Sequence, residues 1–398
     1  MANSGISLTV GVLSERDSHE HRVALDPSAC GRLVHSEMAV LVESDCGLDA
    51  GFPDHAYEAA GATIATRSGV IADCDVLASL SFPPRAVTDQ LVAGQTIIGL
   101  LDPLNSLDRV GPLAEQGLTL VALELLPRTL SRAQAMDALS SQSSAAGYRA
   151  AIVAAEKFGR YLPMMITASG TAIPAKVIVI GTGVAGLQAI ATTKRLGAVV
   201  TGYDVREASR MEVESLGAKF LTSSVAAGTG EGGYARPMTT EEQSTQQQEL
   251  AAALAAFDII ITTAKVPGRT PPLLVSAETL TTLKPGTVCV DLGASDKGGN
   301  VFGSIDGSTT TTTSGVVVVG AGNLAADLPA SASQMYGKNI TAVIEALAPM
   351  GAITIDPTDE IHASLVASHD GIVTNPVLRA AMKLEPLGSS EPLKAQAP

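Results

Sequence analysis

The fold is decided by residues 176–206, which read KVIVIGTGVAGLQAIATTKRLGAVVTGYDVR. In this stretch a short β-branched run ends at a G-x-G-x-x-G turn, a helical pattern follows, and a second apolar run ends at Asp204. An acid about 20 residues after such a turn is typical of a dinucleotide-binding βαβ unit. Because three glycines alone are a weak signal, the prediction depends on the strand–turn–helix–strand order around them. A plain glycine-rich turn is the alternative.

Each residue of the turn has its own predicted task. Gly181 permits the tight turn, Gly183 lets the backbone approach a pyrophosphate, and Gly186 lets the helix pack closely on the strand. The unpaired N–H groups at the start of the helix then face the phosphates. Asp204 can accept hydrogen bonds from both ribose hydroxyls and would repel a 2′-phosphate, so the sequence favours NAD(H) over NADP(H). Arg206 leaves NADP binding open as a lesser alternative.

The composition indicates a globular chain. Hydrophobic residues make up 46% and charged residues 17% of the 398 residues, a length that suits two domains. The net charge of −14 argues against nucleic acid or an anionic membrane surface as a partner, although it also serves solubility alone. Four scattered cysteines without C-x-x-C spacing indicate buried thiols in a reducing compartment, and we expect no metal site. With no apolar window of about 18 residues and no signal-peptide pattern, we expect a soluble protein.

Strand-like and helix-like runs alternate along nearly the whole chain, which predicts an α/β fold of two Rossmann-like domains with parallel sheets and a nucleotide site in the cleft between them. The predicted domains are 1–140 plus 331–398 for the first and 141–330 for the second, NAD(H)-binding one. The predicted strands are 8–13, 39–42, 76–80, 96–100, 120–125, 259–263, 288–291 and 316–319. The predicted helices include 27–36, 53–60, 131–159 and 331–347. We expect the tail past residue 387 to be frayed.

Residues 223–248 break this alternation, because they are polar, rich in Gly and Thr, and nearly free of aliphatic side chains. A loop of this length inside a compact domain is either functional or disordered. Tyr234 follows two glycines and offers a flat apolar face with a hydroxyl. The segment is therefore predicted to be a mobile lid over the cofactor, with an idle insertion as the alternative.

Polar side chains gather in an otherwise small-residue stretch at 127–142. Gln134, Asp137, Ser140 and Ser141 recur at three- and four-residue spacing, so we expect most of them on one helix face. An arginine–aspartate pair formed by Arg128 and Asp137, with Gln134, can hold a nicotinamide carboxamide, which needs both a donor and an acceptor. An ordinary solvated helix face is the alternative.

A further polar group surrounds Arg22, in the segment ERDSHEHRVALDP. Arg22 either binds a carboxylate or phosphate, or pairs with Glu15, and the residues leave both open. The chain has no G-x-S-x-G, H-E-x-x-H or GK[ST] motif, which weighs against hydrolase, zinc protease and P-loop NTPase functions.

Together these segments resemble the NAD(H)-binding α subunit of proton-translocating NAD(P)+ transhydrogenase, a relative of alanine dehydrogenase. The resemblance covers nearly the whole chain and rests on long stretches. They are RVALDP (22–27), AGFPDHAYEAAGA (50–62), PR with SRAQAMDALSSQSSAAGYRAAI (127–152), the glycine motif through ESLGAKF (214–220), GGYA (232–235) and ITTAKVPGRTPPLLV (261–275).

The resemblance implies a Si/Re-specific transhydrogenase, active with its partner subunits, in which hydride passes directly between two nicotinamides. The implied partners are an NADP(H)-binding component, a membrane component that moves protons, and a second copy of the chain. The implied location is cytoplasmic, at the inner face of the membrane. At the site, Arg128, Gln134, Asp137 and Ser140 would hold the nicotinamide and its ribose. The implied nucleotide contacts further along the chain are Gly181, Gly183, Val184, Gly186, Asp204, Val205, Arg206, Tyr234 and Ala264.

Two departures from the family pattern matter. Alanine dehydrogenases carry a K-x-K-E-P-like segment and a catalytic His, whereas the corresponding stretches here read ASLSFPP (78–84) and GLLDPLNSLD (99–108), without Lys or His. A stand-alone amino-acid dehydrogenase is therefore the runner-up, and a non-catalytic NAD-responsive module is a third hypothesis. The second departure is DLGASDKGGN (291–300), where Asp296 and Lys297 replace an expected Glu, so we expect altered loop contacts there.

Overall fold

The computed structural model describes residues 8–15, 19–225, 238–265, 268 and 270–387. It divides into two compact units, one formed by Met1–Gln142 with Pro329–Pro398 and the other by Ser143–Leu328. The predicted Tyr234 contact and the frayed tail lie outside the described residues. Both units are α/β with mostly parallel sheets, which confirms the predicted fold class.

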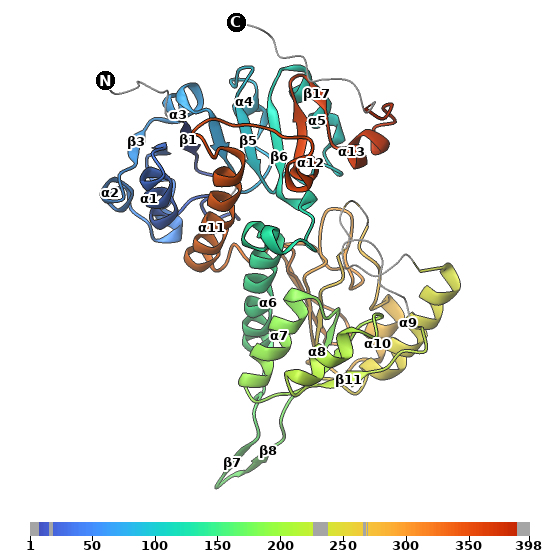
Figure 1. Cartoon of the computed structure of the whole chain (residues 1–398). Coiled ribbons are helices and arrows are strands. Elements are labelled where there is room, and N and C mark those ends of the chain that lie inside the picture. Colours follow the sequence, from blue (N-terminus) through green and yellow to red (C-terminus); the bar gives the residue numbers. More distant parts are fainter. Residues whose placement is uncertain (1–7, 16–18, 226–237, 266–267, 269, 388–398) are drawn as a thin grey trace, which may run out of the picture. The chain divides into compact units, whose positions relative to one another are not determined.

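The first unit is built on a sheet in the order β17-β16-β6-β5-β4-β1-β2-β3 (Figure 1). Its strands are β1 (Thr9–Val12), β2 (Ala39–Glu43), β3 (Thr63–Ala65), β4 (Val76–Ala78), β5 (Thr96–Gly99), β6 (Thr119–Ala122), β16 (Val366–His369) and β17 (Ile372–Val373). Strands β1 to β6 run parallel, and the antiparallel β16 and β17 complete one edge. The strand order reverses between β1 and β4, the point where doubly wound sheets commonly bind ligands.

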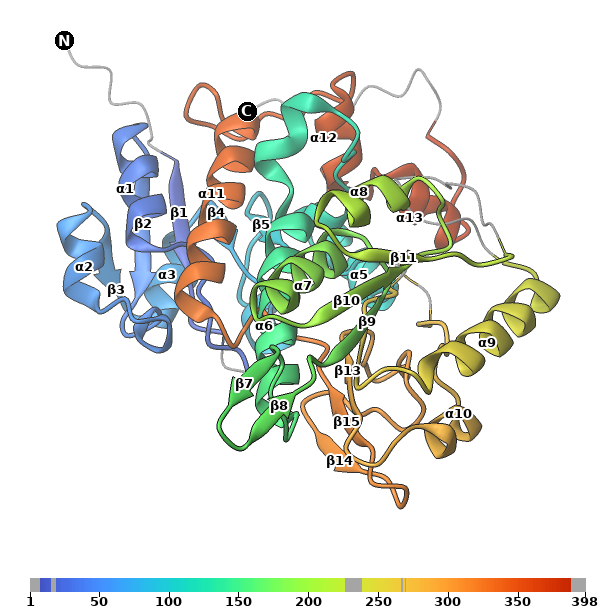
Figure 2. The same ribbon diagram turned by 90° about the horizontal axis from the view of Figure 1, so that it is seen from below.

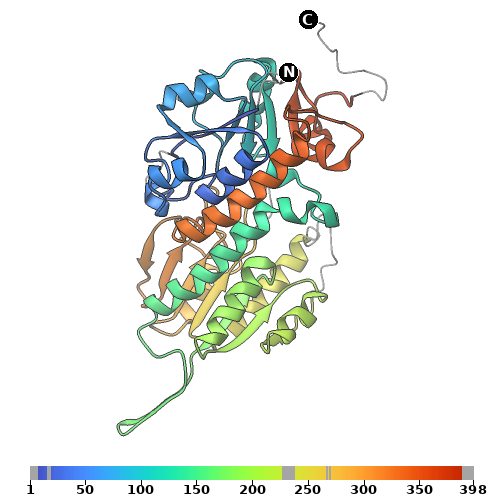
Figure 3. The same ribbon diagram turned by 60° about the vertical axis from the view of Figure 1, so that its left-hand side comes forward.

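Helices cover both faces of this sheet. They are α1 (Pro27–His35), α2 (Asp54–Ala59), α3 (Arg67–Asp73), α4 (Arg85–Thr88), α5 (Leu107–Glu115), α11 (Pro329–Leu347), α12 (Glu360–Leu365) and α13 (Pro376–Ala381), with 3-10 turns η1 (Leu48–Ala50), η2 (Leu123–Leu125) and η3 (Ser131–Met136). The α1 helix begins where the Asp26 side chain accepts backbone N–H bonds and Pro27 presets the first turn. In Figure 3 the red α11 lies beside the blue α1, and its Tyr336, Ile340 and Ile344 are fully buried in the core under β1 and β2.

The second unit is built on a sheet in the order β11-β10-β9-β12-β13-β15-β14, most of which is labelled in Figure 2. Its strands are β9 (Lys176–Ile180), β10 (Val199–Tyr203), β11 (Lys219–Leu221), β12 (Ile259–Thr262), β13 (Val288–Asp291), β14 (Thr309–Thr311) and β15 (Val317–Gly320), of which only β14 is antiparallel. Its helices are most of α6 (Ala138–Lys157), α7 (Val184–Arg195), α8 (Ser209–Ser215), α9 (Thr240–Leu254) and α10 (Ala277–Thr282). A separate hairpin of β7 (Met165–Thr167) and β8 (Gly170–Ala172) extends from this unit (Figure 1).

Two predictions about secondary structure were wrong in part. The helix predicted at 131–159 is interrupted, because Asp137 leaves the helical conformation at ψ 82° and separates η3 from α6. The loop predicted at 223–248 is too long, because α9 already begins at Thr240. Thr239 and Glu242 form a reciprocal capping box there, and Leu250 and Leu254 anchor the helix in the core.

Candidate nucleotide sites in the two units

The glycine turn joins β9 to α7 in the geometry that the sequence predicts. Gly181 has a φ of +91°, and its N–H donates to the Tyr203 carbonyl at 2.8 Å. A Cβ at Gly181 would lie 2.5 Å from the Thr263 hydroxyl, and a Cβ at Gly186 would overlap the Gly181 carbonyl oxygen. Two of the three glycines are therefore required by the packing of the turn itself.

Gly183 differs, because no atom of the residues that the structure describes lies within 4 Å of the position that its Cβ would occupy. It is the N-cap residue of α7, and having no side chain it cannot cap the helix. The first N–H groups of an α-helix have no partner inside the helix and carry partial positive charge. This end of α7, with Val184 36% exposed, offers an open approach for an anion such as a pyrophosphate.

Asp204 follows β10 and lies beside the turn with its carboxylate buried. Its Oδ2 accepts from the Thr182 N–H at 2.8 Å and the Thr182 hydroxyl at 3.1 Å. The Arg206 N–H donates to Oδ1 at 2.9 Å, and the Arg206 guanidinium binds both oxygens at 3.0 Å. Burial alone would raise the pKa of Asp204, but the Arg206 hydrogen bonds and charge outweigh it and lower that pKa. Asp204 is thus held as a carboxylate near neutral pH.

Ala264 and Val205 lie close to the same edge of the sheet. The Asn300 side chain accepts from the Ala264 N–H at 3.0 Å and donates to the Ala264 carbonyl at 2.9 Å, which fixes the backbone after β12. Val205 packs partly buried against the core that contains β9 and β12. Asn300 is a positioning residue that sequence reasoning missed, although it belongs to the GGN segment already noted.

The departing segment 291–300 is organised by a buried carboxylate. Asp291 accepts from the Thr262 hydroxyl at 2.9 Å, the Gly293 N–H at 2.8 Å and the Ser304 hydroxyl at 2.6 Å. Asp296 and Lys297 instead lie exposed in a turn closed by backbone bonds between Ser295 and Gly298. The substitutions therefore fall on the exposed part of this loop.

In the first unit, Arg128, Asp137 and Ser140 form one hydrogen-bonded group. Arg128 Nε donates to Asp137 Oδ2 at 3.1 Å, and Arg128 Nη2 donates to the Ser140 hydroxyl at 3.0 Å. The Ser140 hydroxyl and N–H donate to Asp137 at 2.6 and 2.9 Å. The side chains of Arg128 and Asp137 are 28% and 16% exposed, so the group is accessible yet ordered.

Gln134 does not share a helix face with this group, which corrects the prediction from its spacing. It lies exposed in η3, and the turn at Asp137 separates it from α6. Ser141 instead bonds to Asn339 of α11 at 2.7 Å.

For Arg22, the structure does not show the pairing with Glu15, one of the two alternatives that the sequence left open. Its guanidinium binds Glu20 at 2.7 and 2.6 Å and the Gln142 side chain at 2.7 Å, rather than Glu15. Gln142 in turn donates to the Ala332 carbonyl at 3.0 Å. Sequence reasoning missed Gln142 because its partner lies 120 residues away.

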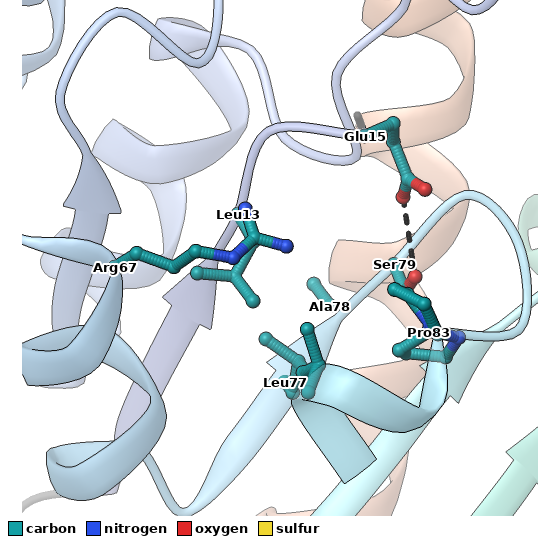
Figure 4. A pocket seen from close by; sticks show the side chains of 9 residues that line it. Leu13, Glu15, Arg67, Leu77, Ala78, Ser79 and Pro83 are labelled. Atoms are coloured by element: carbon teal, nitrogen blue, oxygen red, sulfur yellow. Dashed lines mark hydrogen bonds between the residues drawn. The ribbon is translucent and has the colours of Figure 1, made fainter. Parts of the chain in front are cut away.

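Glu15 occupies the point between β1 and β4 where the strand order reverses (Figure 4). It accepts from the Leu80 N–H at 2.6 Å and from the hydroxyls of Ser79 and Ser81 at 3.1 Å each. Burial raises the pKa of Glu15. The cavity lined by Glu15, Ser79 and Arg67 measures about 20 Å³, which is roughly room for one water molecule.

Within the part of the chain that the structure describes, no group of three or more His, Cys, Asp and Glu side chains could hold a metal ion. No helix among those residues is both long and apolar enough to span a membrane. The four cysteines are buried and unpaired with one another.

The chain matches two family models, described as the N-terminal and C-terminal domains of alanine dehydrogenase/PNT, over residues 11–146 and 150–376. It is 38% identical to a Rickettsia prowazekii protein named as the first part of NAD(P) transhydrogenase subunit alpha, over 94% of this chain and 97% of the relative. It is 40% identical to the protein of the same name in Rhodospirillum rubrum, over 93% and 99%.

Among solved structures, the transhydrogenase from Sinorhizobium meliloti superposes with a TM-score of 0.82 at 40% identity, covering 92% of this chain and 99% of that one. The residues matched by the two family models include the glycine turn and the Arg128 group. The chain therefore belongs to the alanine dehydrogenase/PNT family and, within it, to the NAD(P) transhydrogenase α subunits.

Proposed function

We propose that this chain binds NAD(H) and exchanges hydride directly with NADP(H) held on a partner subunit, while a membrane subunit moves protons. The observation that carries the proposal is the ionised Asp204 beside an open glycine turn. A carboxylate in this position suits the ribose diol of NAD(H) and repels a 2′-phosphate. The relatives are named as one portion of an α subunit, which supports the involvement of further subunits.

The proposed contacts divide between the two units. We assign the pyrophosphate to Gly183 and the start of α7, and the nicotinamide with its ribose to the group of Arg128, Asp137 and Ser140. The guanidinium supplies donors and the carboxylate supplies acceptors, so together they can bind a carboxamide and a ribose hydroxyl. Gln134, which is exposed on η3, would join them with its own amide. Val184, Gly186, Val205, Tyr234 and Ala264 complete the proposed nucleotide contacts, and Arg206 lies beside Asp204 at the proposed ribose position.

In this reaction the protein positions its substrates and does not exchange protons with them. Hydride transfer needs the two reacting carbons within roughly 3–3.5 Å in a fixed orientation, and the nicotinamides carry the chemistry. An amino-acid dehydrogenase would also need a base for the amino group. The stretches 78–84 and 99–108 contain no Lys or His, and their Ser79 and Ser81 are occupied with Glu15.

We further propose that the chain acts as a homodimer at the inner face of the membrane, Si/Re-specific in its transfer and held there by its partners. The partners are an NADP(H)-binding component and a membrane proton-channel component. The acidic net charge of −14 supports a protein partner over nucleic acid.

Parallel titrations of NADH and NADPH, followed by a transfer assay with the cognate NADP(H)-binding subunit, test this proposal. We expect preferential NADH binding and hydride transfer to a nicotinamide analogue only when that subunit is present. Equal affinity for both nucleotides would overturn the cofactor assignment. Pyruvate- and ammonia-dependent NADH oxidation by the isolated chain would establish the amino-acid dehydrogenase instead. Binding without transfer, unaffected by loss of Arg128 and Asp137, would indicate a non-catalytic module.

A further inference from the structure

The acceptor positions of Asp204 are fully used in the chain alone. A carboxylate has about four lone-pair sites, and Asp204 receives five hydrogen bonds, two on Oδ1 and three on Oδ2. If this carboxylate binds the ribose of NAD(H), as proposed above, some of these donors must leave. Which donors leave decides the affinity and selectivity of the ribose contact.

The five donors differ in how easily they are displaced. Two are backbone N–H groups, of Thr182 in the glycine turn and of Arg206 shortly after β10, and they are fixed by the fold. Two more belong to the Arg206 guanidinium, at the end of a flexible side chain. This side chain is 22% exposed, whereas that of Asp204 is 6% exposed, so the guanidinium has a path to solvent.

The guanidinium and a ribose diol make the same kind of contact with a carboxylate. Both present two neighbouring donors to two oxygens, so the 2′- and 3′-hydroxyls can replace the two guanidinium bonds one for one. The exchange costs affinity, because an ion pair with a charged donor is replaced by hydrogen bonds from uncharged hydroxyls. We propose that Arg206 occupies the ribose-diol position of Asp204 in the free chain and must swing away when NAD(H) binds.

The displaced guanidinium also affects selectivity. It remains tethered two residues from Asp204, the acid proposed to bind the 2′-hydroxyl, and so stays within reach of a 2′-phosphate in the same place. A guanidinium is the side chain best suited to a phosphate. Arg206 therefore acts against the selectivity that Asp204 provides: it lowers the affinity for NADH and raises the affinity for NADPH. Arg206 is thus a specificity-determining residue that reduces the ratio of NADH affinity to NADPH affinity.

The test is a titration of NADH and NADPH against wild type, R206Q, R206K, D204N and the double variant D204N/R206Q. R210Q is the matched control, because Arg210 is a nearby arginine that pairs with Glu207 at 2.6 Å and with Glu214 rather than with Asp204. We expect R206Q to bind NADH up to about fivefold tighter, the upper end of the range for an exposed ion pair, and NADPH no tighter. R206K, which keeps the charge but not the paired geometry, should lie between wild type and R206Q.

Two further readouts separate this role from a structural one. The tighter NADH binding predicted for R206Q should vanish in the D204N background, because no carboxylate remains there to be released from its ion pair with Arg206. It should also shrink as salt is raised, because salt weakens the ion pair in the wild type. R210Q should bind both nucleotides like wild type.

NADH binding by R206Q that equals or falls below that of wild type would overturn the inference, since Arg206 would then only orient Asp204. In that case loss of NADH preference in D204N would leave the proposed function standing. An unchanged NADH preference in D204N would instead remove the ribose assignment, and the inference with it. Thermal unfolding of each variant verifies that it is folded, and R206K preserves the test should R206Q prove unstable.

Discussion

At the scale of single residues, Glu124 combines burial with an ionisable group. It follows β6, and its carboxylate accepts from the N–H groups of Asp102 at 2.7 Å and Leu101 at 3.2 Å. Burial raises the pKa of Glu124 from 4.5 to about 7. The folded protein therefore holds this proton at pH values where the unfolded chain has lost it, and the stabilisation is lost as pH rises through 7.

We accordingly predict that wild type loses about 1 kcal/mol of stability between pH 6 and pH 8 relative to E124Q. Glutamine has no charge to bury and keeps one acceptor oxygen, so one of the two N–H bonds is lost at both pH values alike and the pH dependence isolates the carboxyl. Urea unfolding of both proteins at the two pH values measures the difference. An equal change in the free energy of unfolding between pH 6 and pH 8 in both proteins would contradict the raised pKa of Glu124.

The glycine turn yields a second residue-scale prediction, in which two similar substitutions have opposite consequences. G186A places a methyl group against the Gly181 carbonyl and should destabilise the second unit by roughly 1–3 kcal/mol. G183A has open space for its Cβ and should cost less than about 1 kcal/mol, yet weaken NADH binding about tenfold by holding the pyrophosphate away. Thermal unfolding and NADH titration of both variants separate the two effects. A G183A protein that binds NADH normally would exclude the proposed phosphate position.

At the residue scale, local motifs could be predicted from the sequence and long-range side-chain pairs could not. The glycine turn and the group of Arg128, Asp137 and Ser140 were accessible from the sequence, because each lies within a short segment with a recognisable pattern. The Arg22–Gln142 bond joins residues 120 positions apart, and nothing local marks it. Long-range side-chain pairing is set by the packing of whole elements, which the sequence pattern does not specify.

At the scale of elements, α9 shows a signal that was present but outweighed. Its sequence is so polar that the segment predicts a loop, yet Thr239 and Glu242 stand three residues apart, as a capping box requires. Most of the strands that were predicted lie within two residues of the observed bounds, because buried parallel strands are continuous apolar runs, whereas short edge strands such as β3 and β11 were missed. The break at Asp137 was missed because a capping aspartate between two helical patterns resembles a helical residue in spacing alone.

The capping box makes a prediction for α9. T239A should lower stability by about 1 kcal/mol, since it leaves the Glu242 N–H at the helix start without its side-chain acceptor. T239S retains the hydroxyl and is the matched control. Urea unfolding followed by circular dichroism measures both variants. Equal stability of T239A and T239S would mean that the cap contributes nothing and that Leu250 and Leu254 alone hold the helix.

At the scale of the whole molecule, the first unit is assembled from two separate segments of the chain. The second segment contributes α11 and β16, whose Tyr336, Ile344 and Val366 are buried in the core of β1 and β2. We predict that a chain ending at residue 328 loses the folded first unit while the second unit persists. Calorimetry and limited proteolysis would show one remaining folded fragment within 143–328. Protection of residues 1–142 in the truncated chain would contradict this dependence.

This division also determines the order in which the two units can fold during synthesis. Residues 143–328 leave the ribosome before α11 and β16 do, and domains generally fold as units as they emerge. The inserted unit can therefore complete its core while the strands of the first unit still lack their covering helix. Until α11 has been synthesised, the part of the apolar face under β1 and β2 that α1 and α2 do not cover stays exposed and open to chaperones. Codon usage or pausing between residues 143 and 347 should thus affect the yield of folded protein more than changes elsewhere.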